Sequence, residues 1–211
     1  MSPVRTDWLA TSAALLVTGA LALALASVLT PTGSSSADTL RLVQEHDGRW
    51  LAAAAIYFLA AVCLILGLPS ALTLFNQRGR TVGLVGATVL SVGFIGVAGY
   101  AMLLVFFRAM VITDAIRSEA FDRVTHESGL QIFLYGWVIA FYLGELLLAI
   151  GLLRAGTIRR WIPVLLLMHA ATFPVSQVLP ELLAKAVIFL MVFGFAGIGM
   201  RAAEPRPTGP A

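Results

Sequence analysis

The chain has 211 residues, of which 59% are hydrophobic and 12% charged, and its formal net charge is +3. A composition this apolar excludes a soluble globular domain and indicates a membrane protein. The basic residues do not gather in a patch with aromatic residues, so the sequence predicts no binding to nucleic acid.

Six long apolar stretches follow one another along the chain. Each is close to the roughly 20 residues that cross a hydrocarbon core of about 30 Å as a helix. They cover residues 8–30, 50–76, 81–107, 131–153, 161–179 and 182–200. We therefore expect an all-α fold, a polytopic bundle of six transmembrane helices. Residues 1–200 would form one transmembrane domain and residues 201–211 a disordered cytoplasmic tail.

The connections between the stretches fall into two charge classes. The termini and the two short connections are rich in arginine, and the two longer connections are rich in Asp and Glu. The positive-inside rule therefore predicts that both termini are cytoplasmic and that the acidic connections lie outside. We expect a multi-pass protein of the plasma (inner) membrane. Arginine dominates the 14 basic residues, with Lys185 the one lysine, which indicates a GC-rich bacterial genome.

The first stretch also has features of a secretory signal. Arg5 precedes it, and the small-residue sequence Ala24-Leu25-Ala26 follows a long Ala/Leu run. Cleavage after Ala26 would leave five spans. We expect a retained anchor, because the apolar run is longer than that of a usual signal peptide.

No pattern in the sequence indicates a cofactor. Cys63 is the one cysteine, so no internal disulfide can form. His169 is the only histidine inside an apolar stretch, which excludes ligation of haem by two histidines within the spans, and no Cys/His spacing suits a metal. Phosphate-binding glycine loops and serine-nucleophile motifs are also missing. We expect neither a metal nor another cofactor.

The longer connections and the third stretch carry two structural patterns. Residues 38–48 and 113–129 have apolar residues at helical spacing, which predicts two short amphipathic helices over the outer side. In the third stretch, glycines recur at spacings of three and seven, at Gly83, Gly86, Gly93, Gly96 and Gly99. This spacing predicts a ridge at which another helix approaches closely.

Two ionisable residues lie deep inside apolar stretches. Burying a carboxylate near the centre of a bilayer costs roughly 3 kcal/mol on insertion scales, so such residues need a reason. Glu145 and His169 are equally far from Thr157, in the turn between the fourth and fifth stretches, and therefore lie at matching depth. We predict that Glu145 points into the bundle within reach of His169, and we treat both as candidate catalytic residues. The alternative is that they serve only as hydrogen-bonding links between helices.

The neighbours of the pair supply candidate ligand-binding residues. Phe141 and Tyr142 share the stripe of Glu145, and Trp137 lies nearby; Thr172 and Ser176 follow His169 on one helical face. Farther out, Glu181 and Lys185 form an i,i+4 pair of opposite sign near Tyr57, Tyr100 and Tyr135. This outer cluster fits the mouth of a ligand site, and it also fits an ordinary salt-bridged helix start.

Three functions agree with these residues. The first is an intramembrane site for a lipid-soluble, isoprenoid-like ligand. A protonated Glu145 would donate a proton to an alkene or epoxide, and the aromatic rings of Phe141, Tyr142 and Trp137 would face the developing carbocation. Such a site would perform acid-catalysed cyclisation or isomerisation, or would only bind its ligand.

The chain resembles two groups of proteins in general character. Its size, its number of spans and a buried carboxylate among aromatic residues are similar to those of small integral membrane terpene cyclases. That resemblance implies an intramembrane acid–base catalyst, but it rests on no motif and carries over no catalytic residue. The chain also resembles uncharacterised six-helix membrane proteins of GC-rich bacteria, and this second resemblance implies no activity.

The other two functions are an accessory role and transport. A non-catalytic binding subunit of a membrane complex would use the glycine ridge to pack a partner helix. A small proton-coupled transporter would relay protons through Glu145 and His169, between helices broken at Pro69 and Pro174. The expected partners are a membrane lipid or lipid-soluble small molecule, a second copy of the chain, or a partner membrane subunit.

Overall fold

The computed structural model of the chain describes residues 8–31, 33–175 and 181–204, and its regular elements over these ranges are all helices. The all-α prediction is therefore confirmed. In chain order the elements are α1 (Trp8–Leu29), α2 (Ser36–Glu45), α3 (Asp47–Leu72), α4 (Arg80–Ile112), α5 (Ser118–Thr125), α6 (Ser128–Ala155), α7 (Trp161–Ala171), the 3-10 turn η1 (Phe173–Val175) and α8 (Glu181–Ala203).

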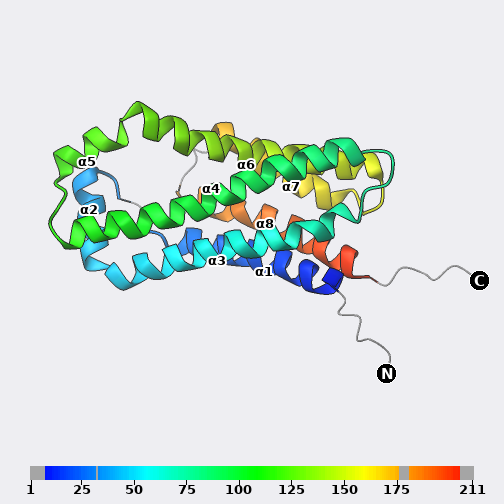
Figure 1. Cartoon of the computed structure of the whole chain (residues 1–211), viewed down its shortest axis with the longest axis horizontal. Coiled ribbons are helices and arrows are strands. Elements are labelled where there is room, and N and C mark those ends of the chain that lie inside the picture. Colours follow the sequence, from blue (N-terminus) through cyan, green and yellow to red (C-terminus); the bar gives the residue numbers. More distant parts are fainter. Residues whose placement is uncertain (1–7, 32, 176–180, 205–211) are drawn as a thin grey trace, which may run out of the picture.

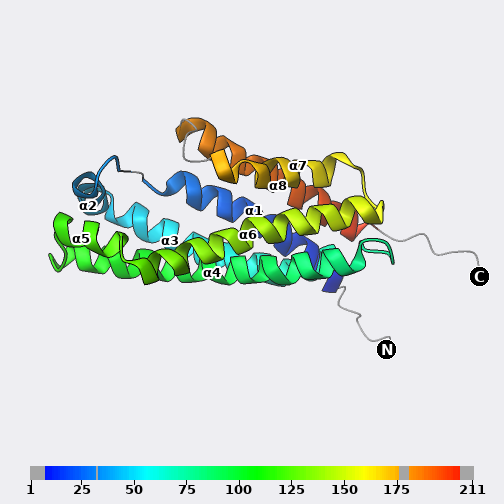
Figure 2. The same ribbon diagram turned by 90° about the horizontal axis from the view of Figure 1, so that it is seen from above.

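Five of these helices, α1, α3, α4, α6 and α8, are long and apolar enough to cross a membrane. They run along the long axis of the molecule, with α1 packed against α3 and α8, and α4 packed against α3 and α6 (Figure 1). The start of α1, the end of α8 and the short α3–α4 and α6–α7 connections share one end, which carries the arginine-rich segments. The opposite end carries α2 and α5 (Figure 2). We name these the basic end and the acidic end.

The expected fifth span is not one continuous helix among the described residues. α7 has 11 residues and ends at Ala171, and the chain continues as the single 3-10 turn η1. Pro174 explains the break, because proline has no backbone N–H to donate and its ring clashes with the carbonyl four residues earlier. At its other end, α8 continues past the expected limit of Met200 to Ala203, so the helix includes the first residues of the segment expected as a tail.

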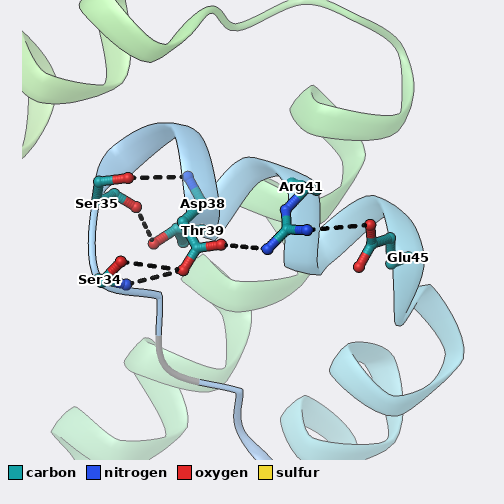
Figure 3. A network of polar contacts seen from close by, with 6 residues as sticks. All are labelled: Ser34, Ser35, Asp38, Thr39, Arg41 and Glu45. Carbon is teal, nitrogen blue, oxygen red and sulfur yellow. Dashed lines mark hydrogen bonds and ion pairs between the residues drawn. The ribbon is translucent and has the colours of Figure 1, made fainter.

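The two short amphipathic helices predicted in the longer connections are confirmed as α2 and α5. Ser35 caps the start of α2, because its hydroxyl accepts a hydrogen bond from the backbone N–H of Asp38 at 3.1 Å. Asp38 also accepts from Arg41 at 2.7 Å, in the polar network that Figure 3 shows. On the other face of α2, Val43 is fully buried in a small apolar cluster with Trp50. A hydrogen bond between Ser36 and Asp122 joins α2 to α5.

The predicted glycine ridge is confirmed at Gly83, Gly86, Gly93 and Gly96. A Cβ atom at Gly93 would lie 2.5 Å from the Cα of Phe141, and one at Gly86 would lie 2.4 Å from the backbone nitrogen of Leu148. The backbones of α4 and α6 therefore touch, as small residues in register allow. Gly99 was wrongly included in the ridge, because a Cβ atom there would meet nothing within 4 Å.

α1 and α3 are joined by a buried serine. The hydroxyl of Ser12 donates to the carbonyl of Leu66 at 2.8 Å and accepts from the backbone N–H of Ser70 at 3.2 Å. In an unbroken helix these two backbone groups would bond to each other. Ser12 therefore inserts into the hydrogen-bond ladder of α3 beside Pro69, which is a recognised cause of helix bending.

Candidate intramembrane site

Glu145 on α6 and His169 on α7 form a buried pair. Nδ1 of His169 lies 2.7 Å from Oε2 of Glu145, and the exposed fractions of the two side chains are 6% and 0%. The predicted proximity of the two residues is confirmed. Two ionisable side chains are tolerated in a core this apolar only when they are paired with each other, because either one alone would be strongly destabilising.

The α6–α7 turn fixes the level at which the pair meets. Gly156 ends α6 in the left-handed conformation, with φ of 64°, which glycine adopts without strain. The hydroxyl of Thr157 donates to the carbonyl of Leu74, and the amide of Asn76 donates to the carbonyl of Ala155 at 2.8 Å. The two turns at the basic end therefore hold each other, which sets the register of α7 against α6.

Aromatic rings surround the imidazole. The ring of Tyr142 lies 5.3 Å from that of His169, at an interplanar angle of 30°, and the ring of Phe141 lies 6.4 Å away, edge to face. Tyr142 in turn stacks on Phe173 of η1, with 4.7 Å between ring centroids. The imidazole is thus clamped between rings from the helix that also carries its carboxylate partner.

An apolar cavity of about 190 Å³ lies beside the pair. Its lining residues include His169, Trp137, Phe141 and Tyr142, whereas Glu145 is not among them. Glu145 therefore stands behind His169 as seen from the cavity. The sequence had suggested Glu145 as the group facing a ligand. In the structure His169 lines the cavity instead, and the carboxylate of Glu145 contacts the imidazole from the other side.

Two polar atoms near the cavity are buried without a hydrogen-bond partner among the described residues. They are Oε1 of Glu145 and Nε1 of Trp137. An unsatisfied buried polar group costs about 1–3 kcal/mol, and such groups are rare in folded proteins. The two residues lie eight positions apart on α6, about 12 Å along the helix, and each unpartnered atom lowers the stability of the fold.

Of the other predicted binding residues, Thr172 does not line the cavity. The hydroxyl of Thr172 donates to the carbonyl of His169 at 2.6 Å, within its own helix. Ser176 lies outside the described residues, and Glu181 is described only as the first residue of α8, without its side chain.

Sequence reasoning placed Tyr57 and Tyr100 in the outer cluster, but both line the cavity. Their rings contact each other edge to face at 5.5 Å, and the ring of Tyr100 lies 6.0 Å from that of Trp137. Their shared depth was readable from the sequence, but the faces of α3 and α4 on which they lie were not. Tyr135, the third member of that cluster, is 56% exposed and does not line the cavity.

The geometry allows proton exchange with a ligand through one ring nitrogen. Glu145 occupies Nδ1, so Nε2 is the nitrogen of His169 that can donate to or accept from a molecule in the cavity. A carboxylate on one side of an imidazole fixes its orientation and stabilises its protonated form. Among the described residues no three His, Cys, Asp or Glu side chains gather as a metal site.

Comparison with known proteins finds no matching family, no similar curated protein and no similar solved structure.

Proposed function

We propose that the chain is a multi-pass membrane protein that binds a small lipid-soluble ligand in the aromatic cavity, with His169 contacting an oxygen atom of that ligand. The observation that carries this proposal is the buried Glu145–His169 pair, with 2.7 Å between its polar atoms. It lies beside a cavity that is lined by His169 but not by Glu145. The lining is apolar and aromatic with few polar groups, which is the usual character of a small-molecule site. A ligand with one carbonyl or hydroxyl group and an isoprenoid body suits this lining.

The same pair can serve acid–base chemistry on that ligand. His169 would pass a proton to the ligand oxygen from Nε2, while Glu145 would hold the imidazole and stabilise its charge as a positioning residue. The aromatic faces of Phe141 and Tyr142 would stabilise a positive charge that develops on the ligand. Acid-catalysed isomerisation or cyclisation is thus the reaction class that the residues favour.

Two features favour this function over the other two. Towards the basic end from the pair, Leu148, Leu152 and Leu166 are almost completely buried, so a transporter would have no polar route there. A purely structural link between helices gains nothing from leaving Oε1 of Glu145 and Nε1 of Trp137 without partners.

The proposal is tested by the binding of geraniol, geranial and the hydrocarbon myrcene to the purified protein, measured by native mass spectrometry. We expect the two oxygenated probes to bind more tightly than myrcene by about three- to tenfold, the value of one net hydrogen bond. Glu145→Gln keeps the shape of the side chain but removes the negative charge that would stabilise a protonated His169, so any cyclised or isomerised product should disappear with this variant.

A double variant, His169→Phe with Glu145→Leu, removes the polar pair without leaving one partner buried alone. It should bind all three probes equally, and His126→Phe at an exposed histidine should behave as the wild type. Equal binding of the three probes by the wild-type protein, or no binding at all, would contradict the proposal.

A further inference from the structure

A second, larger cavity, which is open at the molecular surface, lies towards the acidic end, between α4, α5 and α6. Its volume is about 510 Å³ and its lining is almost wholly apolar. α4 contributes Leu103, Phe106 and Phe107, and α5 contributes Phe121 and Val124. The short helix α5 therefore forms part of the wall of this outer cavity.

The two cavities share the ring of Tyr100, which lines both. The ring is positioned by its contacts with Tyr57 on one side and Trp137 on the other. Trp50 lines the outer cavity and is itself fixed, because its indole N–H donates to the carbonyl of Leu104 at 3.1 Å. Tyr100 thus belongs both to the wall of the cavity that His169 lines and to the wall of the almost wholly apolar outer cavity.

The volumes are compatible with one ligand that occupies both cavities. Small-molecule sites usually have volumes of roughly 300–1,000 Å³. The inner cavity of about 190 Å³ is smaller than this range, whereas the inner cavity and the outer cavity of about 510 Å³ taken together lie within it. A ligand with a long chain would need both.

The depth of the outer cavity also matters. Tyr100 lies about 30 Å along α4 from Arg80 at 1.5 Å per residue, which equals the thickness of the hydrocarbon core. With Arg80 at one membrane interface, the residues from Leu103 onward would be level with the opposite interface, where lipid chains no longer cover apolar side chains. A hydrocarbon-lined cavity at that level is best satisfied by a bound hydrocarbon chain.

We propose that the two cavities form one elongated site for a single-chain lipophile that carries one terminal oxygen group. The oxygen lies at His169 in the inner cavity, and the chain passes Tyr100 and ends beneath α5 in the outer cavity. This inference rests on the proposed function, because it takes His169 as the contact for the ligand oxygen. It adds that the ligand is longer than the inner cavity and that its chain is held on the outer side of the membrane.

The test compares geraniol with the longer geranylgeraniol, which has the same hydroxyl group. Leu103→Trp places an indole in the outer cavity, and Val105→Trp is the matched control on the same helix, at a residue that lines neither cavity. We expect Leu103→Trp to lower the affinity for geranylgeraniol by about tenfold, because the added indole overpacks a site that the ligand fills. The affinity for geraniol should not change. Val105→Trp should alter neither affinity. In the wild-type protein the two alcohols should compete for one site.

The outcomes separate the two proposals. Equal affinity of Leu103→Trp and the wild-type protein for geranylgeraniol would overturn the elongated site, while geraniol binding would leave the function at His169 standing. Simultaneous binding of both alcohols to one protein would also overturn it, because the cavities would then be independent. Failure of the wild-type protein to bind either alcohol would defeat the proposed function itself. Wild-type thermal stability of Leu103→Trp, measured alongside, ensures that a lost affinity reports on the site.

Discussion

The hydroxyl of Ser12 accepts a hydrogen bond from the backbone N–H of Ser70, 58 residues away, at the place where Pro69 interrupts α3. The same hydroxyl donates to the carbonyl of Leu66, so one side chain of α1 contacts both backbone groups that an ideal helix would pair with each other. Both serines are fully buried. In a membrane, where water cannot satisfy backbone groups, such a replacement keeps a proline-containing helix intact.

Ser12→Ala should lower the free energy of unfolding by about 1–3 kcal/mol, because it removes the partner of the buried N–H of Ser70 and of the partly buried carbonyl of Leu66. The measurement is thermal unfolding of the purified protein in detergent. Thr18→Ala is the control, since Thr18 lies on the same helix and is exposed. Equal stability of the two variants would mean that α3 closes its own hydrogen bond when the serine is removed.

Gly93→Ala should also destabilise the protein, by about 1–3 kcal/mol, because the new methyl group meets the backbone of Phe141 and neither backbone can give way. Gly99→Ala should be neutral or slightly stabilising. It meets nothing within 4 Å, and alanine is a better helix former than glycine. The two melting temperatures, compared in one detergent, check the close approach of α4 and α6. A lower stability of Gly99→Ala than of Gly93→Ala would contradict it.

The orientation of the bundle is tested by thiol labelling in a Cys63→Ala background. Cysteine at Ala37, an exposed residue of α2, should react with an impermeant reagent in intact cells. Cysteine at the exposed Arg78 should react only after the cells are opened, because arginine-rich turns remain cytoplasmic. Gly79 is unsuitable, since its φ is 92° and a Cβ atom would lie 2.3 Å from the carbonyl oxygen of Gly151. The reverse labelling pattern would show that the acidic end is cytoplasmic and would contradict the predicted orientation.

The attachment of α2 should depend on pH. The hydrogen bond from Arg41 holds the pKa of Asp38 below its usual value, helped by the backbone N–H of Ser34. A lowered pKa in the folded state means that the contribution of Asp38 is present above its unfolded pKa of about 4 and is lost as the pH falls through the folded value. In a variant that keeps Trp50 as its one tryptophan, the emission should shift to longer wavelength as the pH is lowered through this range.

Asp38→Asn should produce the same emission shift at neutral pH, because the amide cannot replace the carboxylate opposite Arg41. Glu119→Gln, which removes an acidic charge from the exposed face of α5, provides the control. If Asp38→Asn gives the wild-type emission at neutral pH, the polar network around Asp38 does not hold α2 over Trp50.

The helices could be predicted from the sequence, but some of their ends could not. Length and apolarity are enough to recognise α1, α3, α4, α6 and α8. α4 was expected to end at Phe107 and reaches Ile112, because Arg108 bonds to Asp47 at the start of α3 and remains within the helix. The break after Ala171 could have been inferred more firmly from Pro174. The end of α4 therefore depends on a tertiary contact, whereas the break after Ala171 follows from the local backbone restriction at proline.

The sequence predicts the level along the helices at which the site residues lie, but not how each helix is rotated about its own axis. The equal spacing of Glu145 and His169 from Thr157 was sufficient to place them at one level, and the short turn made their helices neighbours. Which residue faces the cavity depends on how each helix turns about its axis, and no periodicity of an almost uniformly apolar helix fixes that angle. Ser12 was missed for a related reason: its only signal is Pro69, whose interrupted ladder requires a partner from another helix.

The central claim, that His169 rather than Glu145 contacts the ligand, is tested most directly by nitrogen-15 NMR of the histidine side chains. The chain has three histidines, and the His169 signals are identified by their loss in His169→Gln. Addition of geranial should shift the Nε2 resonance of His169 and leave those of His46 and His126, which lie exposed at the acidic end, unchanged. If geranial binds and the His169 signals do not move, the pair is only a structural link between α6 and α7.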